Sequence, residues 1–265
     1  MAFRLKSVAE LRKELGQYDA VVQLTEISVR NFIENARTHS SIRDYITEQS
    51  QKYNIRTNDV EMDILMNRLP LQYIASVQQY AEYFLYKFKE EYEELYNYKI
   101  ELGDTNENFL DKLISKLPYN KQALMSEVGE VHYGIISYYK KIRNKYSHYF
   151  QISDSSLQKE HQKLLLKKSE IKEIYELSDV PNDYENLTFN DFMLFTRALK
   201  YFANNLCNYI EPNEEIIIEH LKRKKFKLNL LNREKRYKNA IKSYLTHEFG
   251  IDNININYIY TALVA

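Results

Sequence analysis

Apolar residues recur at intervals of three and four over most of the chain, a spacing typical of amphipathic helices. The longest such stripe covers residues 73–95, and two others cover 124–142 and 188–210. The chain has only five Gly and four Pro, whereas strand-rich folds need many turn residues. We therefore predict an all-α fold. The first 56 residues add two or three helices, at Val8 to Leu15, Tyr18 to Ala36 and Ser41 to Tyr53.

Composition divides the helical pattern into three segments. Residues 1–56 form an N-terminal helical segment, and residues 57–211 form a helical core. A polar, Lys-rich insertion at 151–185 interrupts the core, and residues 212–265 form a C-terminal extension. Each proline lies near an apparent helix boundary, because proline cannot donate a backbone hydrogen bond. The four prolines are Pro70, Pro118, Pro181 and Pro212.

The C-terminal extension has a different pattern. Phe226, Leu228 and Leu230 alternate with polar residues, and alternation returns at residues 254–260, after a helical stretch from Arg233 to Glu248. Alternation favours two short strands flanking a helix. The alternative is that the final residues, NYIYTALVA, form a helix.

Positive charge is concentrated in the same extension, although the whole chain is formally neutral. Residues 220–242 hold ten basic residues against one acidic residue, a net charge of +9. A concentrated positive segment suits a polyanionic partner such as RNA. The alternative is a solvated helix face. The residues that we expect to contact RNA phosphates are Lys222, Arg223, Lys224, Lys225, Arg233 and Arg236.

Several classes of protein are disfavoured. The single cysteine, Cys207, cannot form an internal disulfide or a cysteine-based zinc site. No stretch approaches the 18 apolar residues of a membrane span, and the N-terminus lacks the apolar core of a signal peptide. Glycine-rich phosphate loops and familiar metal or hydrolase motifs are missing. We expect a cytoplasmic protein without metal or cofactor.

The remaining candidate chemistry lies in IRNKYSH, where Arg143 and His148 are separated by four residues. RNA can be cleaved through its own 2′-OH by a base of near-neutral pKa, an acid and fixed positive charge. His148 suits the base, and Arg143 suits the charge because guanidinium grips phosphate oxygens in a fork. Lys145 and Tyr146 could contact RNA, and Asn144 follows the arginine.

In this helical context the chain resembles the HEPN superfamily of ribonucleases, whose signature is Arg-x4–6-His with a polar residue after the arginine. The resemblance covers residues 57–211, and Glu82 occupies the acidic position of an upstream helix in several HEPN families. It implies a dimeric endoribonuclease that acts as a toxin or anti-phage effector with a restraining protein partner. One departure is Phe150, where toxins regulated by nucleotidyltransferases usually have a modified tyrosine.

Helix geometry bears on how the motif could work. Five positions at about 100° each leave Arg143 and His148 roughly 140° apart on an unbroken helix. Either the helix breaks between Lys145 and Ser147, or each residue meets its counterpart from a second subunit. A two-fold dimer would bring two Arg and two His to one phosphate. We predict a homodimer, with Glu82 orienting Arg143.

Three alternative interpretations of the motif and of the chain do not require catalysis. Arg143 and His148 could simply stabilise the C-terminal end of a helix. The chain could also be a non-catalytic module of the same fold that binds RNA, nucleotide or a protein. A purely structural helical adaptor is the third possibility, because one fold serves many functions.

Overall fold

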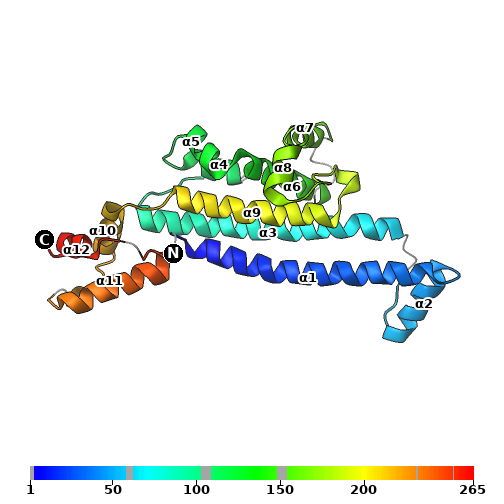
Figure 1. Cartoon of the computed structure of the whole chain (residues 1–265), viewed down its shortest axis with the longest axis horizontal. Coiled ribbons are helices and arrows are strands. Elements are labelled where there is room, and N and C mark those ends of the chain that lie inside the picture. Colours follow the sequence, from blue (N-terminus) through cyan, green and yellow to red (C-terminus); the bar gives the residue numbers. More distant parts are fainter. Residues whose placement is uncertain (1–2, 58–61, 103–108, 148–153, 231, 253) are drawn as a thin grey trace. The chain divides into compact units, whose positions relative to one another are not determined.

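The computed structural model describes residues 3–57, 62–102, 109–147, 154–230, 232–252 and 254–265, without the side chains of 63–65 and 154. All regular elements in these ranges are helical, which confirms the predicted all-α class. The α-helices, drawn in Figure 1, are α1 (Lys6–Arg37), α2 (Ile42–Tyr53), α3 (Met62–Tyr96), α4 (Phe109–Lys116), α5 (Lys121–Val128), α6 (Glu130–Ser147), α7 (Asp154–Leu165), α8 (Lys168–Tyr175), α9 (Phe189–Tyr209), α10 (Glu214–Arg223), α11 (Glu234–Phe249) and α12 (Ile256–Val264). Two 3-10 turns are η1 (Tyr184–Asn186) and η2 (Leu228–Leu230).

The chain divides into two compact units, each assembled from separate parts of the sequence. Helices α1, α3, α6 and α9 each contribute one part of their length to each unit. The three segments inferred from composition stay a prediction. Unit 1 comprises Met1–Lys13, Gln79–Tyr133 and Ala198–Ala265, and unit 2 comprises Glu14–Gln78 and Gly134–Arg197.

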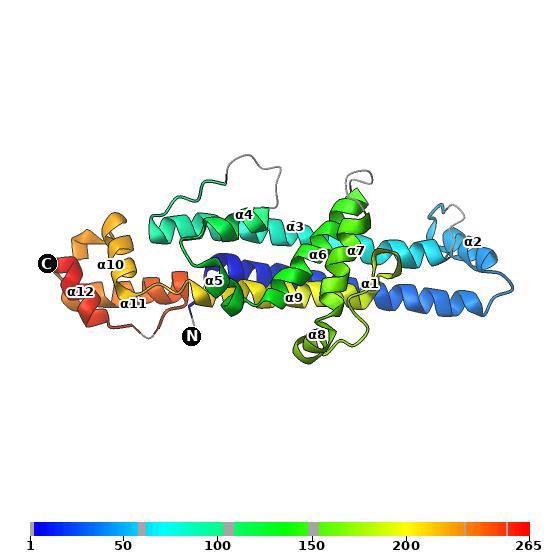
Figure 2. The ribbon, with the colours of Figure 1, turned by 90° about the horizontal axis from the view of Figure 1, so that it is seen from above.

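Unit 2 is built around aromatic side chains of α6 and α9. The Tyr139 and Phe195 rings stack at 5.2 Å between centroids, and Phe192 meets Tyr73 of α3 edge-on at 5.7 Å. Helix α7 lies beside α6 (Figure 2). It approaches so closely at Gly134 that a Cβ atom there would lie 3.3 Å from a methyl carbon of Leu164. Glycine therefore permits the α6–α7 contact.

Unit 1 buries the second half of the α3 stripe, including Phe84, Phe88 and Tyr92, against its own hydrophobic residues. The C-terminal helices α10, α11 and α12 group together in this unit (Figure 1). Each of them buries an isoleucine, and these are Ile217, Ile241 and Ile259. The extension is thus a packed part of unit 1.

The two strands favoured by alternation in this extension are absent from the described residues. Leu228–Leu230 forms η2, preceded by Lys225 and Lys227 at φ of 46° and 42°, which turns the chain instead of extending it. Residues Ile256–Val264 form α12, capped by Asn255, whose side chain accepts from the amide of Tyr258. The helical alternative is correct. The middle helix is confirmed as α11.

Three helix boundaries also differ from prediction, and the first is that the helices predicted at Val8 to Leu15 and Tyr18 to Ala36 are one continuous helix, α1. Pro70 lies inside α3, although it cannot donate the backbone hydrogen bond that other interior residues of a helix donate. Its side chain is buried. The apolar stripe from 124 to 142 predicted one helix, but Gly129 divides it into α5 and α6. Gly129 has φ of 95°, and a Cβ atom there would lie 2.7 Å from the His132 ring. Pro118, Pro181 and Pro212 do lie between helices.

Candidate functional site

The Arg143 motif lies in the last turns of α6. The helix buries Val131, Ile135, Tyr138 and Ile142 on one face, and the residues from Arg143 to Tyr146 follow this stripe, each half-buried. Helix α6 continues to Ser147, so it does not break between Lys145 and Ser147. His148 and Phe150 lie outside the described residues, and nothing here tests their predicted roles.

The Arg143 guanidinium is held by its neighbour. Its Nη1 donates to Oδ1 of Asn144 at 3.1 Å. This bond uses one of the five N–H donors of the guanidinium. The structure therefore brings together Arg143 and Asn144, two of the predicted catalytic residues.

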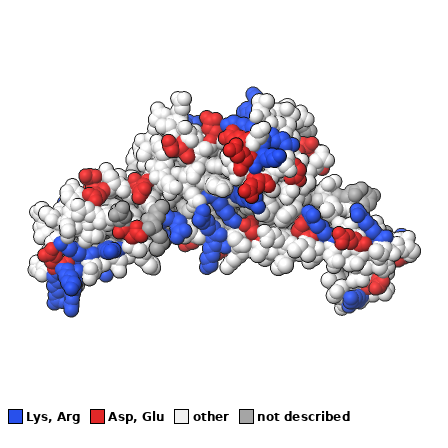
Figure 3. Space-filling model, viewed as in Figure 1, with Lys and Arg blue, Asp and Glu red and all other residues white. Residues whose placement is uncertain are grey.

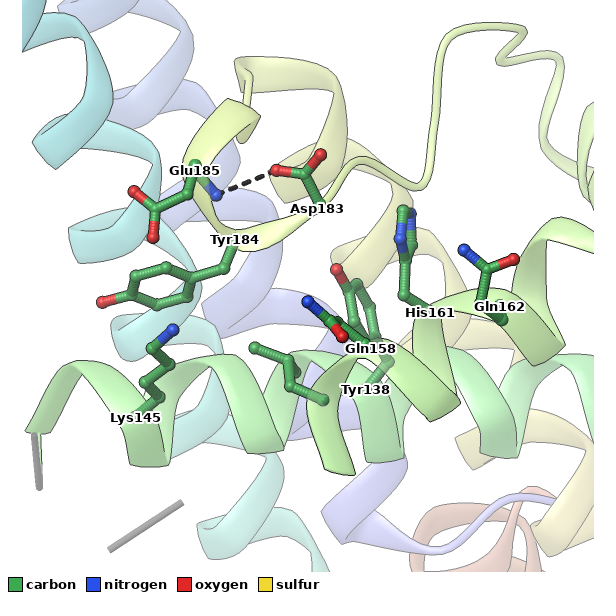
Figure 4. A pocket seen from close by; sticks show the side chains of 9 residues that line it. Tyr138, Lys145, Gln158, His161, Gln162, Asp183, Tyr184 and Glu185 are labelled. Carbon is green, nitrogen blue, oxygen red and sulfur yellow. Dashed lines mark hydrogen bonds between the residues drawn. The ribbon is translucent and has the colours of Figure 1, made fainter. Parts of the chain in front are cut away.

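Lys145, from the same turn, lines a polar groove of about 500 Å³ within unit 2. Its Nζ lies 4.2 Å from the ring centroid of Tyr184, a cation–π contact that orients both side chains. Figure 4 shows Lys145, Gln158 and His161 on one side of the groove, and Asp183, Tyr184 and Glu185 on the other. Two elements of the predicted insertion, α7 and η1, thus form the groove beside the motif helix.

His161 of α7 is held in a definite orientation. Its ring stacks on Tyr138, with centroids 5.5 Å apart and planes 17° from parallel. Its Nε2 lies 3.1 Å from the carbonyl oxygen of Pro181. Because a carbonyl only accepts, Nε2 carries a hydrogen.

The wall that carries Tyr184 is organised by Asp191, whose side chain is wholly buried. One carboxylate oxygen accepts from the Tyr139 hydroxyl at 2.7 Å and the Asn182 amide at 2.9 Å. The other accepts from the Asn182 side chain at 2.9 Å and the Thr188 amide at 2.8 Å. A buried carboxylate with this many donors holds the loop between α8 and α9 in one conformation.

Sequence reasoning missed His161, Tyr184 and Asp191. Thr188-x-x-Asp191 is a capping box, a signal readable at the start of α9. His161 lies four residues after Leu157, which is buried, so the helical period places both on one face of α7. For Tyr184, nothing in the sequence separated it from 23 other tyrosines.

Other predicted residues have different surroundings. Glu82 is half-buried in unit 1, whereas Arg143 belongs to unit 2, and the predicted pairing between them stays a prediction. Tyr146 is half-buried. His132 is buried and stacks on Tyr201, with ring centroids 5.4 Å apart.

The basic segment, residues 222–242, lies within unit 1 and contains two kinds of cation. Arg223 donates to the carbonyl oxygens of Glu94 and Leu95 at 3.1 and 2.8 Å, and Lys224 pairs with the Glu94 carboxylate. These carbonyls belong to the last turn of α3, which has no intrahelical donors for them. Arg223 and Lys224 thus stabilise the negative end of α3.

Three further cations of the segment lie at the opposite kind of helix end, the N-terminus of α11. Arg233 precedes α11 without a side-chain capping bond, and Lys235 and Arg236 are exposed in the first turn. Figure 3 shows Lys and Arg gathering at this end of the α10–α11 region. A cation at a helix N-terminus opposes the helix dipole by about 0.3–1 kcal/mol. Positive charge placed there against local stability favours an anionic ligand. Lys222 and Lys225 are also exposed.

Comparison with known proteins identifies no relative, because no family model, curated protein or solved structure matches this chain. Within the described ranges, His, Cys, Asp and Glu side chains form no group of three that could hold a metal ion. Likewise, none of the helices described combines the length and apolar character needed to cross a bilayer.

Proposed function

We propose that the protein is a metal-independent endoribonuclease, similar to HEPN ribonucleases, with its chemistry at the end of α6. The observation that carries the proposal is the Arg143 guanidinium, which is oriented by a hydrogen bond to Asn144. The next residue after Asn144 is Lys145, which lines a polar groove. A fixed guanidinium is suited to the charge that develops on phosphate oxygens during transfer.

In the proposed reaction, the His148 imidazole removes the proton from a ribose 2′-OH. The 2′-oxygen attacks the adjacent phosphorus, and the bond to the 5′-oxygen breaks as that oxygen takes a proton from an acid. The products are a 2′,3′-cyclic phosphate and a 5′-hydroxyl end. Arg143 stabilises the extra negative charge in the transition state.

The proposal includes a homodimer that supplies the acid. Helix α6 continues through Ser147, so there is no break before that residue that could bring positions 143 and 148 to one face. A second copy related by two-fold symmetry would contribute its own histidine. Toxicity in cells, a restraining protein partner and RNA binding by the basic segment are part of the same proposal.

The test is cleavage of total RNA in excess EDTA by the full-length protein. We expect fragments with 2′,3′-cyclic phosphate ends, and a rate about 10²–10⁴-fold lower in His148→Ala and Arg143→Ala. Matched controls are Arg37→Ala and His247→Ala, both at exposed positions, which should cleave normally. Light scattering should give twice the mass of one chain. Cleavage that persists in either motif variant would remove the proposal.

A second candidate is a non-catalytic module that binds RNA. It is favoured by the exposed cations at the start of α11, which do not depend on the α6 motif. Salt-dependent RNA binding with no cleavage by the wild type would identify this function.

A further inference from the structure

We propose that the groove beside α6 is a nucleobase subsite, and that it selects a base carrying an exocyclic amino group. The proposal deepens the proposed function, on which it rests for the identity of the ligand as RNA. The proposal is argued from three features of the groove, which are its flat rings, its charge and its hydrogen-bonding groups. All the residues that line the groove belong to unit 2.

The shape of the lining suits a planar ligand. The half-buried His161 ring, which stacks on the buried ring of Tyr138, lies on one wall, and the Tyr184 ring stands on the facing wall (Figure 4). Leu157 adds apolar surface. Nucleobases stack on aromatic side chains without regard to sequence, so the rings by themselves would accept any base.

The charges in the groove decide which part of the nucleotide enters. Asp183 and Glu185 line it together with only one cation, Lys145, among the residues that form its lining. Lys145 lies over the Tyr184 ring, at the α6 side. Carboxylates repel a phosphate, so the phosphate would remain toward the α6 motif while the base enters between the walls.

The hydrogen-bonding groups then discriminate among bases. Asp183 already accepts from the amides of Glu185 and Asn186, at 3.0 and 3.1 Å. Glu185 is exposed and acceptor-only when ionised. Acceptors pair with amino groups, as carboxylates do with the N4 amino group of cytosine. Adenine, cytosine and guanine carry such a group, whereas uracil has no amino group and offers a single N3–H donor between two carbonyl acceptors.

The experiment is equilibrium binding of labelled 2′-O-methyl oligonucleotides that differ in one base, A, C, G or U, in a constant flank. These probes cannot be cleaved by 2′-OH attack, so the measurement does not depend on catalysis. The full-length wild type should bind the A, C and G probes about fivefold to tenfold more tightly than the U probe. Glu185→Gln should abolish that difference, because an amide offers a donor where the carboxylate only accepts.

Two controls separate this subsite from general effects. Glu173→Gln, an exposed acidic residue of α8, makes the same change of charge in unit 2 and should keep the preference. Tyr184→Ala should weaken all four probes about fivefold, while Tyr184→Phe, which keeps the ring, should not.

The outcomes distinguish this inference from the proposed cleavage. Base preference that depends on Glu185, in a protein that does not cut RNA, supports the subsite and removes the ribonuclease. Cleavage with equal binding of all four probes removes the subsite and leaves the ribonuclease. The subsite is also overturned if no probe binds, if the preference survives Glu185→Gln, or if Glu173→Gln abolishes it equally.

Discussion

The end of α6 and the basic segment both carry cations, but the two regions hold them differently. At the end of α6, Arg143 is bonded to Asn144 and Lys145 lies over an aromatic ring at a groove. In the basic segment, Arg223 and Lys224 are committed to the end of α3, while Arg233 and Arg236 are exposed. The segment richer in charge therefore has fewer cations available to a ligand than its sequence indicates.

The density of charge along a segment and the geometry of a binding site are therefore separate properties. Exposed lysines and arginines attract any polyanion, and their contribution weakens with salt. Side chains held by neighbours can instead position one phosphate or one base, because the cost of ordering them has been met during folding. We expect the basic segment to supply affinity and the α6 region to supply selectivity.

The largest expected effect concerns the scaffold of the groove. Asp191→Ala would leave the amides of Asn182 and Thr188 and the buried Tyr139 hydroxyl without their acceptor. We expect the free energy of unfolding to fall by about 3–5 kcal/mol in urea denaturation. Asp179→Ala is the matched control, since this exposed carboxylate accepts from the Asn190 side chain at the surface and its loss should cost less than about 1 kcal/mol. Equal losses would mean that the groove wall does not depend on Asp191.

Next in size is the loss of RNA affinity when the basic segment is neutralised. Replacing Lys225, Arg233 and Arg236 by Gln should weaken single-stranded RNA binding at least about tenfold at low salt. The slope of log affinity against log salt should fall by about 2, as three phosphate contacts disappear. The control replaces three exposed lysines elsewhere by Gln, and unchanged affinity there is required. These lysines are Lys121, Lys168 and Lys172.

A smaller effect separates the two kinds of cation within the segment. Arg223→Ala should lower the free energy of unfolding by about 1 kcal/mol and leave RNA affinity unchanged, because the guanidinium caps α3. Arg236→Ala should weaken RNA binding and leave the free energy of unfolding unchanged. Urea denaturation and RNA titration of both variants test this prediction. Equal changes in stability and in RNA affinity for the two variants would contradict the division of the segment into two kinds of cation.

The smallest effect concerns one of the buried histidines of unit 1, His132. Burial lowers the pKa of His132 below its usual 6.5, so the folded protein binds a proton there less readily than the unfolded chain. The stability linked to His132 is therefore complete above about pH 6.5 and is lost as the pH falls toward the folded pKa. His132→Phe should reduce the loss of unfolding free energy between about pH 7.5 and pH 5.

Much of the fold was readable in the sequence, because apolar periodicity and side-chain caps act locally. The α3 and α9 stripes, the Ser41 cap of α2 and the span of α11 all follow from residues within a few positions of one another. Alternation failed in the extension because short apolar runs do not distinguish a strand from a buried helix. In α12 only Ile259 is fully buried.

The sequence by itself determined the helical class, the Arg143–His148 spacing and the +9 segment, since these depend only on the order of residues. Only the tertiary structure decided that Asp191 holds the loop carrying Tyr184, and that His161 faces the same groove as Lys145. It also decided that Arg223 caps α3, more than 120 residues earlier in the chain. Such partners meet through packing between distant segments, and local patterns of residues carry no record of those contacts.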